Sequence, residues 1–275
     1  MLYIPNGGRW RAQHNWGSVA TATPGASVTT GGTAATKGTP VEIFSSTNFD
    51  TCLVAIGISE YAAAATASRL MVDLLIGAAT ESVLINNLVG SHGGATYGGL
   101  QYYFPLYIPA GSRVAVQAAG DRTTTACRVQ VALYGGLISS PWQVGSGVET
   151  YGVGTVPAGT AVTPGNAADG AWVQMTSSSL RNHFAWHAAL QHPTDTSWGS
   201  ARIYQWELGV GGAGSEVLIQ EGGMFAWDSN EAQHGPTLRW PIMADIPAAS
   251  AMSTRWSGSG TLETGDYQTV LYGVY

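Results

Sequence analysis

The chain has 275 residues, which suits one large domain or two of ordinary size. Hydrophobic residues make up 45% and charged residues only 10%, against a usual charged share of about 25%, and the 10 Trp and 12 Tyr argue against intrinsic disorder. A net charge of −6 without a basic run excludes nucleic-acid binding through phosphates. An ordered chain with so few charges indicates that partner subunits cover much of its surface.

The chain begins with an arm, residues 1–20, which lies upstream of the repeated part and is rich in Arg and Trp: Arg9, Trp10, Arg11 and Trp16. Free tails seldom carry two tryptophans, so we expect this arm to dock onto a neighbouring subunit, with a flexible tail as the alternative. The first residues lack a basic region followed by an apolar run, and no stretch approaches the ~20 apolar residues of a spanning helix. We therefore expect no signal peptide, synthesis in the cytoplasm and no membrane insertion.

The rest of the chain is an internal repeat, with one copy over residues 21–137 and a second over 142–275. The matching segments keep their order. They are VEIFSS from Val41 with VQMTSS from Val173, DLLIGAATESVLI from Asp73 with ELGVGGAGSEVLI from Glu207 without a gap, and VALYGG from Val131 with TVLYGVY from Thr269.

Each copy reads as short strands separated by turn residues. Apolar residues alternate with period two, as in Val54, Ile56 and Ile58. The spacing of strands and turns is typical of an all-β fold, so we predict two tandem antiparallel β-sandwich domains, jelly-roll-like and related by the internal repeat. Cys52 and Cys127 fall on apolar positions of these strands and are expected to be buried thiols, with a disulfide as the alternative.

No catalytic, metal or cofactor site stands out. His183 and His187 form an HxxxH, but on a strand the two side chains lie roughly 13 Å apart, too far to share one ion. Asp73 and Glu207 align between the copies, whereas Glu81 and Glu216 are one position out of register, and a glycosidase would need such carboxylates paired at one site. We interpret the aligned pair as structural and expect no enzyme activity.

The second copy holds eight of the ten tryptophans. Five residues in its long loops could form a sugar-binding surface, in which a ring stacks on the sugar and polar groups bind its hydroxyls: Trp227, Asp228, Asn230, His234 and Trp198. Aromatic residues also anchor protein contacts, so a subunit interface is the alternative and favoured interpretation.

The runs DLLIGAATESVLINNL from Asp73, FPLYIPAGSRVAVQAAG from Phe104 and VALYGG from Val131 resemble virion structural proteins of tailed bacteriophages and gene transfer agents. The resemblance covers most of the first copy and, more weakly, the second. It implies β-sandwich domains of a fibre, spike or tail-surface protein, located in the virion. It carries over no functional residue.

The leading hypothesis is therefore a non-enzymatic virion component that assembles with other virion proteins as a homo-oligomer, such as a trimer, and contacts host-surface polysaccharide. Residues 1–137 together have a net charge of +1, so the first copy is nearly neutral. Because it follows the arm, we assign it to the attached side. The second copy, with a net charge of −7, is assigned to the exposed side. The alternatives are a stand-alone carbohydrate-binding module and a glycan-cleaving enzyme.

Overall fold

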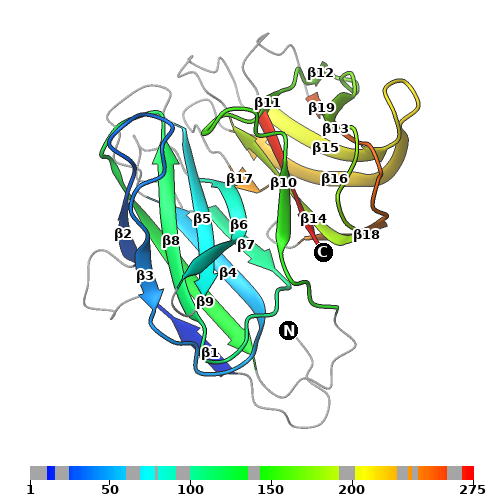
Figure 1. The fold of residues 1–275 in the computed structure, drawn as a ribbon. Helices are drawn as coiled ribbons and strands as arrows, with labels where there is room; N and C mark the ends of the chain where they lie inside the picture. Colours follow the sequence, from blue (N-terminus) through cyan, green and yellow to red (C-terminus); the bar gives the residue numbers. More distant parts are fainter. Residues whose placement is uncertain are drawn as a thin grey trace.

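The computed structural model describes residues 11–15, 25–59, 69–77, 80–90, 100–135, 143–191, 202–227, 235–236, 241–258 and 268–275. Every helix or strand assigned within these residues is a β-strand, as the period-two alternation predicts. The strands form two sandwiches, one drawn in blue to green and the other in green to red (Figure 1). The predicted fold class, two tandem jelly-roll-like sandwiches, is confirmed.

The first sandwich consists of a sheet ordered β1-β9-β4-β7, in which β2 also pairs with β9, and a sheet ordered β3-β8-β5-β6. Its strands are β1 (Arg11–His14), β2 (Ala26–Thr29), β3 (Val41–Phe44), β4 (Thr51–Ser59), β5 (Leu70–Gly77), β6 (Glu81–Val89), β7 (Leu100–Phe104), β8 (Arg113–Gly120) and β9 (Ala126–Gly135).

The second sandwich consists of a sheet ordered β10-β20-β14-β17, joined by β11 and β18, and a sheet ordered β12-β19-β15-β16, joined by β13. Its strands are β10 (Val148–Tyr151), β11 (Thr160–Ala161), β12 (Gly165–Asn166), β13 (Val173–Thr176), β14 (His183–Gln191), β15 (Arg202–Val210), β16 (Val217–Trp227), β17 (Gly235–Pro236), β18 (Ile242–Ile246), β19 (Met252–Gly258) and β20 (Gln268–Val274).

The two sandwiches share one strand order. β10 and β11 pair with β20 as β1 and β2 pair with β9, and β13-β19-β15-β16 repeats β3-β8-β5-β6. Two four-stranded sheets connected in this order form the jelly roll. The internal repeat is therefore a repeat of topology as well as of sequence.

The N-terminal segment is partly a strand of the first sandwich rather than an arm separate from it. Arg11–His14 pairs antiparallel with β9, with Arg11 opposite Gly135, in the way that β10 pairs with β20. Sequence comparison misses this strand because RAQH has no resemblance to its counterpart VETY, and only the backbone pairing relates them.

The gap-free alignment of the β5–β6 hairpin with the β15–β16 hairpin is wrong by one residue after the turn. Ile76 lies opposite Ser82, whereas its counterpart Val210 lies opposite Val217, so the second turn is one residue longer. Gly211 and Gly214 have positive φ values, 135° and 80°, and allow this longer turn. In the ladder Glu216 therefore becomes the counterpart of Glu81.

Each sandwich is filled by apolar side chains, and the larger cluster extends beyond the first sandwich. It includes residues of the second sandwich that point out of its own core: Ala185, Ala189, Val270, Tyr272 and Val274. A smaller cluster between the second sandwich's sheets contains Trp186, Trp206 and Trp256, all fully buried.

Candidate functional site: the join between the two sandwiches

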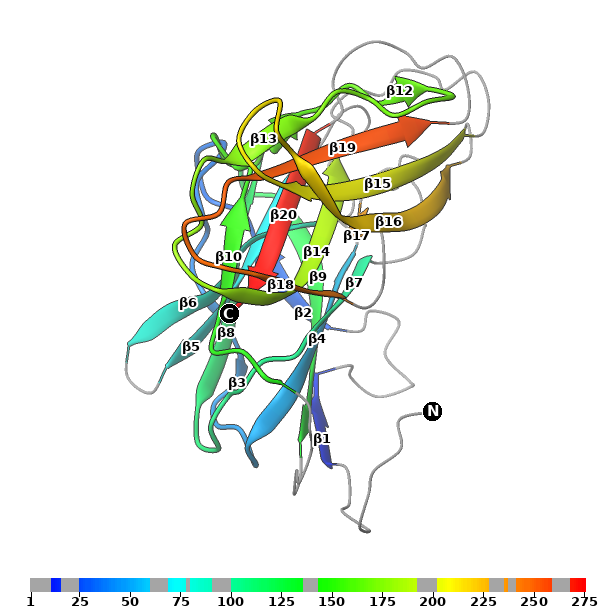
Figure 2. The ribbon, with the colours of Figure 1, turned by 90° about the vertical axis from the view of Figure 1, so that its right-hand side faces the viewer.

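The join is the contact between the outer face of the β10-β20-β14 sheet and the edge of the first sandwich at β6 and β7 (Figures 1 and 2). Strand β14 is buried on both faces, with Trp186 on the inner face and Ala185 and Ala189 on the outer face. A strand that is apolar on both sides is typical of a central sheet. The alanines allow the two sandwiches to approach closely.

Tyr272 on β20 satisfies the backbone of edge strand β6. Its hydroxyl accepts a hydrogen bond from the Val89 amide (2.9 Å) and donates one to the Asn87 carbonyl (3.0 Å). The hydroxyl of Tyr102 on β7 donates to the Val89 carbonyl (2.8 Å). Both tyrosines are fully buried, and burial raises the pKa of each. Side chains from both sandwiches thus occupy the position that a further strand would take beside β6.

His187 on β14 completes the join. Its Nε2 lies 2.8 Å from the carbonyl oxygen of Tyr103, and its ring meets the rings of Phe104 and Tyr102 edge-on, with centroids 4.8 and 6.0 Å away. Burial lowers the pKa of His187 to about 4, so the ring is neutral at pH 7 and donates from Nε2. Within the part of the chain that the structure describes, Nδ1 is buried without a hydrogen-bond partner.

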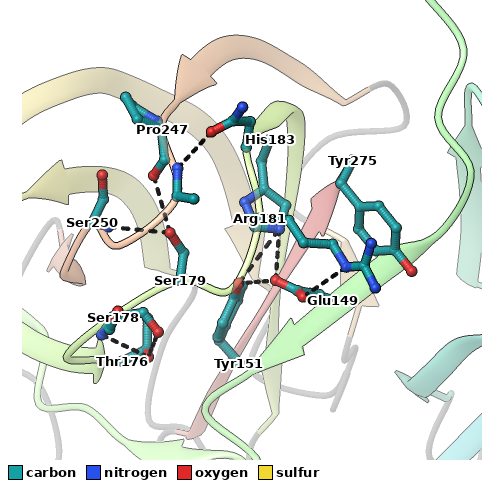
Figure 3. A network of polar contacts seen from close by, with 12 residues as sticks. Glu149, Tyr151, Thr176, Ser178, Ser179, Arg181, His183, Pro247, Ser250 and Tyr275 are labelled. Carbon is teal, nitrogen blue, oxygen red and sulfur yellow. Dashed lines mark hydrogen bonds and ion pairs between the residues drawn. The ribbon is translucent and has the colours of Figure 1, made fainter.

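A polar cluster anchors β10, the first strand after the connection between the sandwiches (Figure 3). The Glu149 carboxylate accepts a hydrogen bond from the Tyr151 hydroxyl, and it lies 3.0 Å from Nε2 of His183 and 3.4 Å from Nε of Arg181. Arg181 also stacks over the Tyr275 ring at 4.2 Å. Three donors therefore converge on one carboxylate, and they tie β10 to β14 and to the last residue of the chain.

The charge state of this cluster follows from burial. Desolvation lowers the pKa of His183, although the adjacent carboxylate of Glu149 opposes the shift. Burial and the same carboxylate raise the pKa of Tyr151. A Cβ on Gly273, the β20 residue opposite Trp186, would lie 2.5 Å from the His183 ring, which explains why glycine occurs there. The cluster therefore fixes the position of β10, and the Glu149 carboxylate is already engaged by the Tyr151, His183 and Arg181 side chains.

The aligned carboxylates Asp73 and Glu207 are buried, and each is engaged by a cation of its own sandwich. Asp73 lies 2.6 Å from the Lys37 ammonium, and it accepts hydrogen bonds from Gln117 (2.9 Å) and the Asn87 amide (2.7 Å).

Glu207 pairs with Arg255. That arginine also lies 2.8 Å from Asp169 and stacks over Trp172 at 4.5 Å. Both carboxylates hold strands together, which agrees with the structural interpretation.

The predicted sugar-binding residues fall at the limit of the described structure or beyond it. Trp227 is the last residue of β16, where its backbone lies opposite Arg202. Asp228, Asn230, His234 and Trp198 lie outside the described residues. The sugar-binding set therefore stays a prediction.

Of the four predicted assembly residues, one lies within the described structure and three lie outside it. Arg11 opens β1 and is exposed, while Arg9, Trp10 and Trp16 lie outside the described residues. Both cysteines are free thiols, with Cys127 buried and Cys52 half-buried.

No group of three or more metal-ligating side chains gathers in the described ranges. His183 and His187 make separate contacts instead of sharing an ion. Among the described residues, no helix has the length and apolar character needed to cross a membrane.

Sequence reasoning missed the residues of the join and of the polar cluster. Glu149 and Arg181 belong to no motif, and Tyr272 lies on a strand whose repeat counterpart carries a tyrosine at the same place, Tyr134. The signal that could have been used is β14, whose outward positions carry Ala185, His187 and Ala189 where a solvent-facing strand would be polar.

Fold and join together define the class: two jelly-roll sandwiches fused through a shared core. No family model and no curated protein matches the chain.

Among solved structures it is similar to STIV MCP, a viral capsid protein, with a TM-score of 0.39 and 10% identity over 97% of this chain and 96% of that one. It is similar to PNGF-II, with a TM-score of 0.37 and 9% identity over 90% and 65%. It is also similar to the CBM22-1-CBM22-2 tandem domain of Xyn10C from Paenibacillus barcinonensis, with a TM-score of 0.29 and 9% identity over 98% and 92%. Identities this low assign no function to the chain.

Proposed function

We propose that the chain is a non-enzymatic structural component of a phage or phage-like virion, of the fibre, spike or tail-surface type, that assembles as a homo-oligomer with other virion proteins. The observation that carries the proposal is the join. Tyr102, Phe104, His187 and Tyr272 are buried between the sandwiches, so the two jelly rolls form one rigid block.

A rigid block suits a building element, because its two ends keep a fixed relation when other subunits bind. Tandem modules that only bind ligands have no such need and are often separated by flexible linkers. The low charge and the exposed apolar side chains of β16 also favour a surface that other subunits cover.

The host-facing part of the proposal rests on the sequence. Trp227, with Asp228, Asn230, His234 and Trp198, is proposed to contact host-surface glycan. One stacked ring contributes roughly 1–3 kcal/mol, by analogy with bases stacked on aromatics, so avidity within an oligomer would be needed to hold a cell.

The test is quantitative mass spectrometry of particles purified from the cells that encode the chain, combined with immunogold labelling. We expect the chain at a fixed stoichiometry relative to other virion proteins and label on the particle surface. Absence from particles, or glycan cleavage by the purified chain, would overturn the proposal.

A further inference from the structure

Strand β6 carries a bulge at the place where it meets the second sandwich. Residues 71–74 of β5 lie opposite residues 85–89 of β6, so β6 has one residue more than its partner along this stretch. Asn87, within the stretch, has a positive φ of 55°. Glycine adopts such a backbone conformation most readily, and asparagine is among the few other residues that tolerate it. The regular pairing of β5 with β6 is therefore interrupted at Asn87.

The bulge presents the backbone groups that bind the second sandwich. Thr150 of β10 donates a hydrogen bond to the Asn86 carbonyl (2.6 Å), and Tyr272 donates one to the Asn87 carbonyl (3.0 Å). The Tyr272 hydroxyl also accepts a hydrogen bond from the Val89 amide (2.9 Å). In a regular strand, the carbonyls of successive residues point to opposite sides. The bulge therefore allows the carbonyls of Asn86 and Asn87 to face the same neighbouring sandwich.

Asp73 of β5 holds the bulge from the other side. Its Oδ1 accepts a hydrogen bond from the Asn87 amide (2.7 Å) and lies 2.6 Å from the Lys37 ammonium, while its Oδ2 accepts one from Gln117 (2.9 Å). The amide and carbonyl of one residue point to the same side in a regular strand. At Asn87 they are divided, because the amide binds Asp73 and the carbonyl binds Tyr272.

The second sandwich has a bulge at the same place. Residues 205–208 of β15 lie opposite residues 220–224 of β16, again with one residue more on the second strand. By this register, Gly222 takes the place of Asn87. A glycine adopts the left-handed conformation without a steric penalty, whereas Asn87 adopts it with its amide bound by Asp73. The bulge belongs to the repeat, and Asn87→Gly is a substitution that the repeat itself makes.

We propose that Asp73 is a positioning residue for the join: by accepting the Asn87 amide, it orients the bulge so that its backbone groups meet Thr150 and Tyr272. A buried ion pair of the first sandwich thus controls how firmly the second sandwich is held. The inference rests on the proposed function in taking the join as the element that makes one rigid block. Particle mass spectrometry tests that function separately.

Hydrogen exchange of the full chain distinguishes positioning from a general gain in stability. Lys37→Met/Asp73→Leu replaces the ion pair with apolar side chains of similar size, which is often neutral for stability, but it removes the acceptor of the Asn87 amide. We expect the Val89 amide to exchange about tenfold faster or more, with the amides of β8 unchanged. Lys37→Met/Asp73→Asn is the conservative variant. Its side-chain oxygen can still accept from the Asn87 amide, so Val89 should stay protected.

A rescue variant and a matched control complete the test. Adding Asn87→Gly to Lys37→Met/Asp73→Leu should restore most of the protection of Val89, because glycine does not need the carboxylate to form the bulge. Glu207→Gln, which changes the equivalent carboxylate of the second sandwich, should leave the exchange of Val89 unchanged.

The proposal is overturned if Val89 exchanges at the wild-type rate in Lys37→Met/Asp73→Leu. It is also overturned if the leucine and asparagine variants speed that exchange equally, or if the amides of β8 lose protection to the same extent as Val89, because Asp73 would then act on the whole sandwich. Each variant must first show the wild-type circular dichroism spectrum. Lys37→Met/Asp73→Ala, which removes the acceptor without adding bulk, replaces the leucine variant if that variant does not fold.

Discussion

The first and second sandwiches share a strand order but differ in what covers their edges. In the first, the β6 edge is closed by a neighbouring jelly roll, and one apolar cluster runs through both sandwiches. In the second, the corresponding strand β16 pairs with β15 alone among the described residues, and beside its turn it exposes Val217 to Ile219, as β6 exposes Val83 at the equivalent place. The strand order of a jelly roll therefore does not determine whether an edge strand is buried. Burial depends on which surface lies against that edge.

Phe104 is fully buried on β7, with its ring 4.8 Å from His187 and 6.3 Å from Tyr272. We expect Phe104→Ala to lower the free energy of unfolding by about 3–5 kcal/mol, because it leaves a cavity where the sandwiches meet.

Denaturant unfolding followed by circular dichroism measures this change. Tyr107→Ala is the control, since Tyr107 is 46% exposed just after β7, and its change should stay within about 0.5 kcal/mol. A loss below about 1 kcal/mol for Phe104→Ala would show that the join contributes little to stability.

The aligned carboxylates give the second comparison. Asp73→Asn removes the charge that neutralises Lys37, the only lysine, whose pKa burial already lowers. We expect a loss of about 3 kcal/mol, because a cation left unpaired in a mostly buried site is costly.

Glu207→Gln should destabilise less, because Arg255 keeps Asp169 and the Trp172 ring. Denaturant titrations of the two variants at pH 7 measure the loss of unfolding free energy in each sandwich. Equal losses would mean that the contacts of Arg255 with Asp169 and Trp172 contribute nothing to stability.

The sequence predicts the strands, the repeat and the jelly-roll class because alternation and turns depend on neighbouring residues. It does not predict the join. Tyr134 and Tyr272 occupy equivalent places in LYG motifs, yet only Tyr272 is fully buried, because burial is decided by a strand 183 residues away in the chain. The one-residue slip at Val217 and the strand at Arg11–His14 were missed for the same reason: backbone pairing, rather than side-chain pattern, defines them.

Acid should weaken the join. The pKa of His187 is about 4 in the folded chain and about 6.5 when unfolded. Between these values the unfolded chain binds the extra proton, so stability is complete above pH 6.5 and falls as the pH drops towards 4. The loss from this residue is about 3 kcal/mol, and the lowered pKa of His183 adds a loss of the same sign.

Denaturant unfolding from pH 7 to pH 4 measures this slope. In His187→Gln, whose amide can still donate to the Tyr103 carbonyl, the slope should be reduced to the part that other groups contribute. An unchanged slope would show that His187 does not titrate on unfolding.

The smallest expected effect comes from removing the hydroxyl of Tyr272, which we compare with removing that of Tyr134 at the equivalent position of the first sandwich. Tyr272→Phe leaves the Val89 amide and the Asn87 carbonyl of β6 without their partner in a fully buried place. We expect a loss of about 1–3 kcal/mol, the cost of an unsatisfied buried group. Tyr134→Phe, at the equivalent position of the first sandwich, should change stability by less than about 0.5 kcal/mol, because that tyrosine is only half-buried.

Hydrogen exchange of β6 in the monomeric chain shows whether the loss is local. If the hydroxyl of Tyr272 stands in for a paired strand, the Val89 amide should exchange faster in Tyr272→Phe, while amides of β8 in the centre of the same sheet keep their protection. Uniform loss of protection would mean that the hydroxyl supports the whole fold. Faster exchange at β6 in Tyr134→Phe would contradict the comparison itself, since the two tyrosines would then act alike despite their different burial.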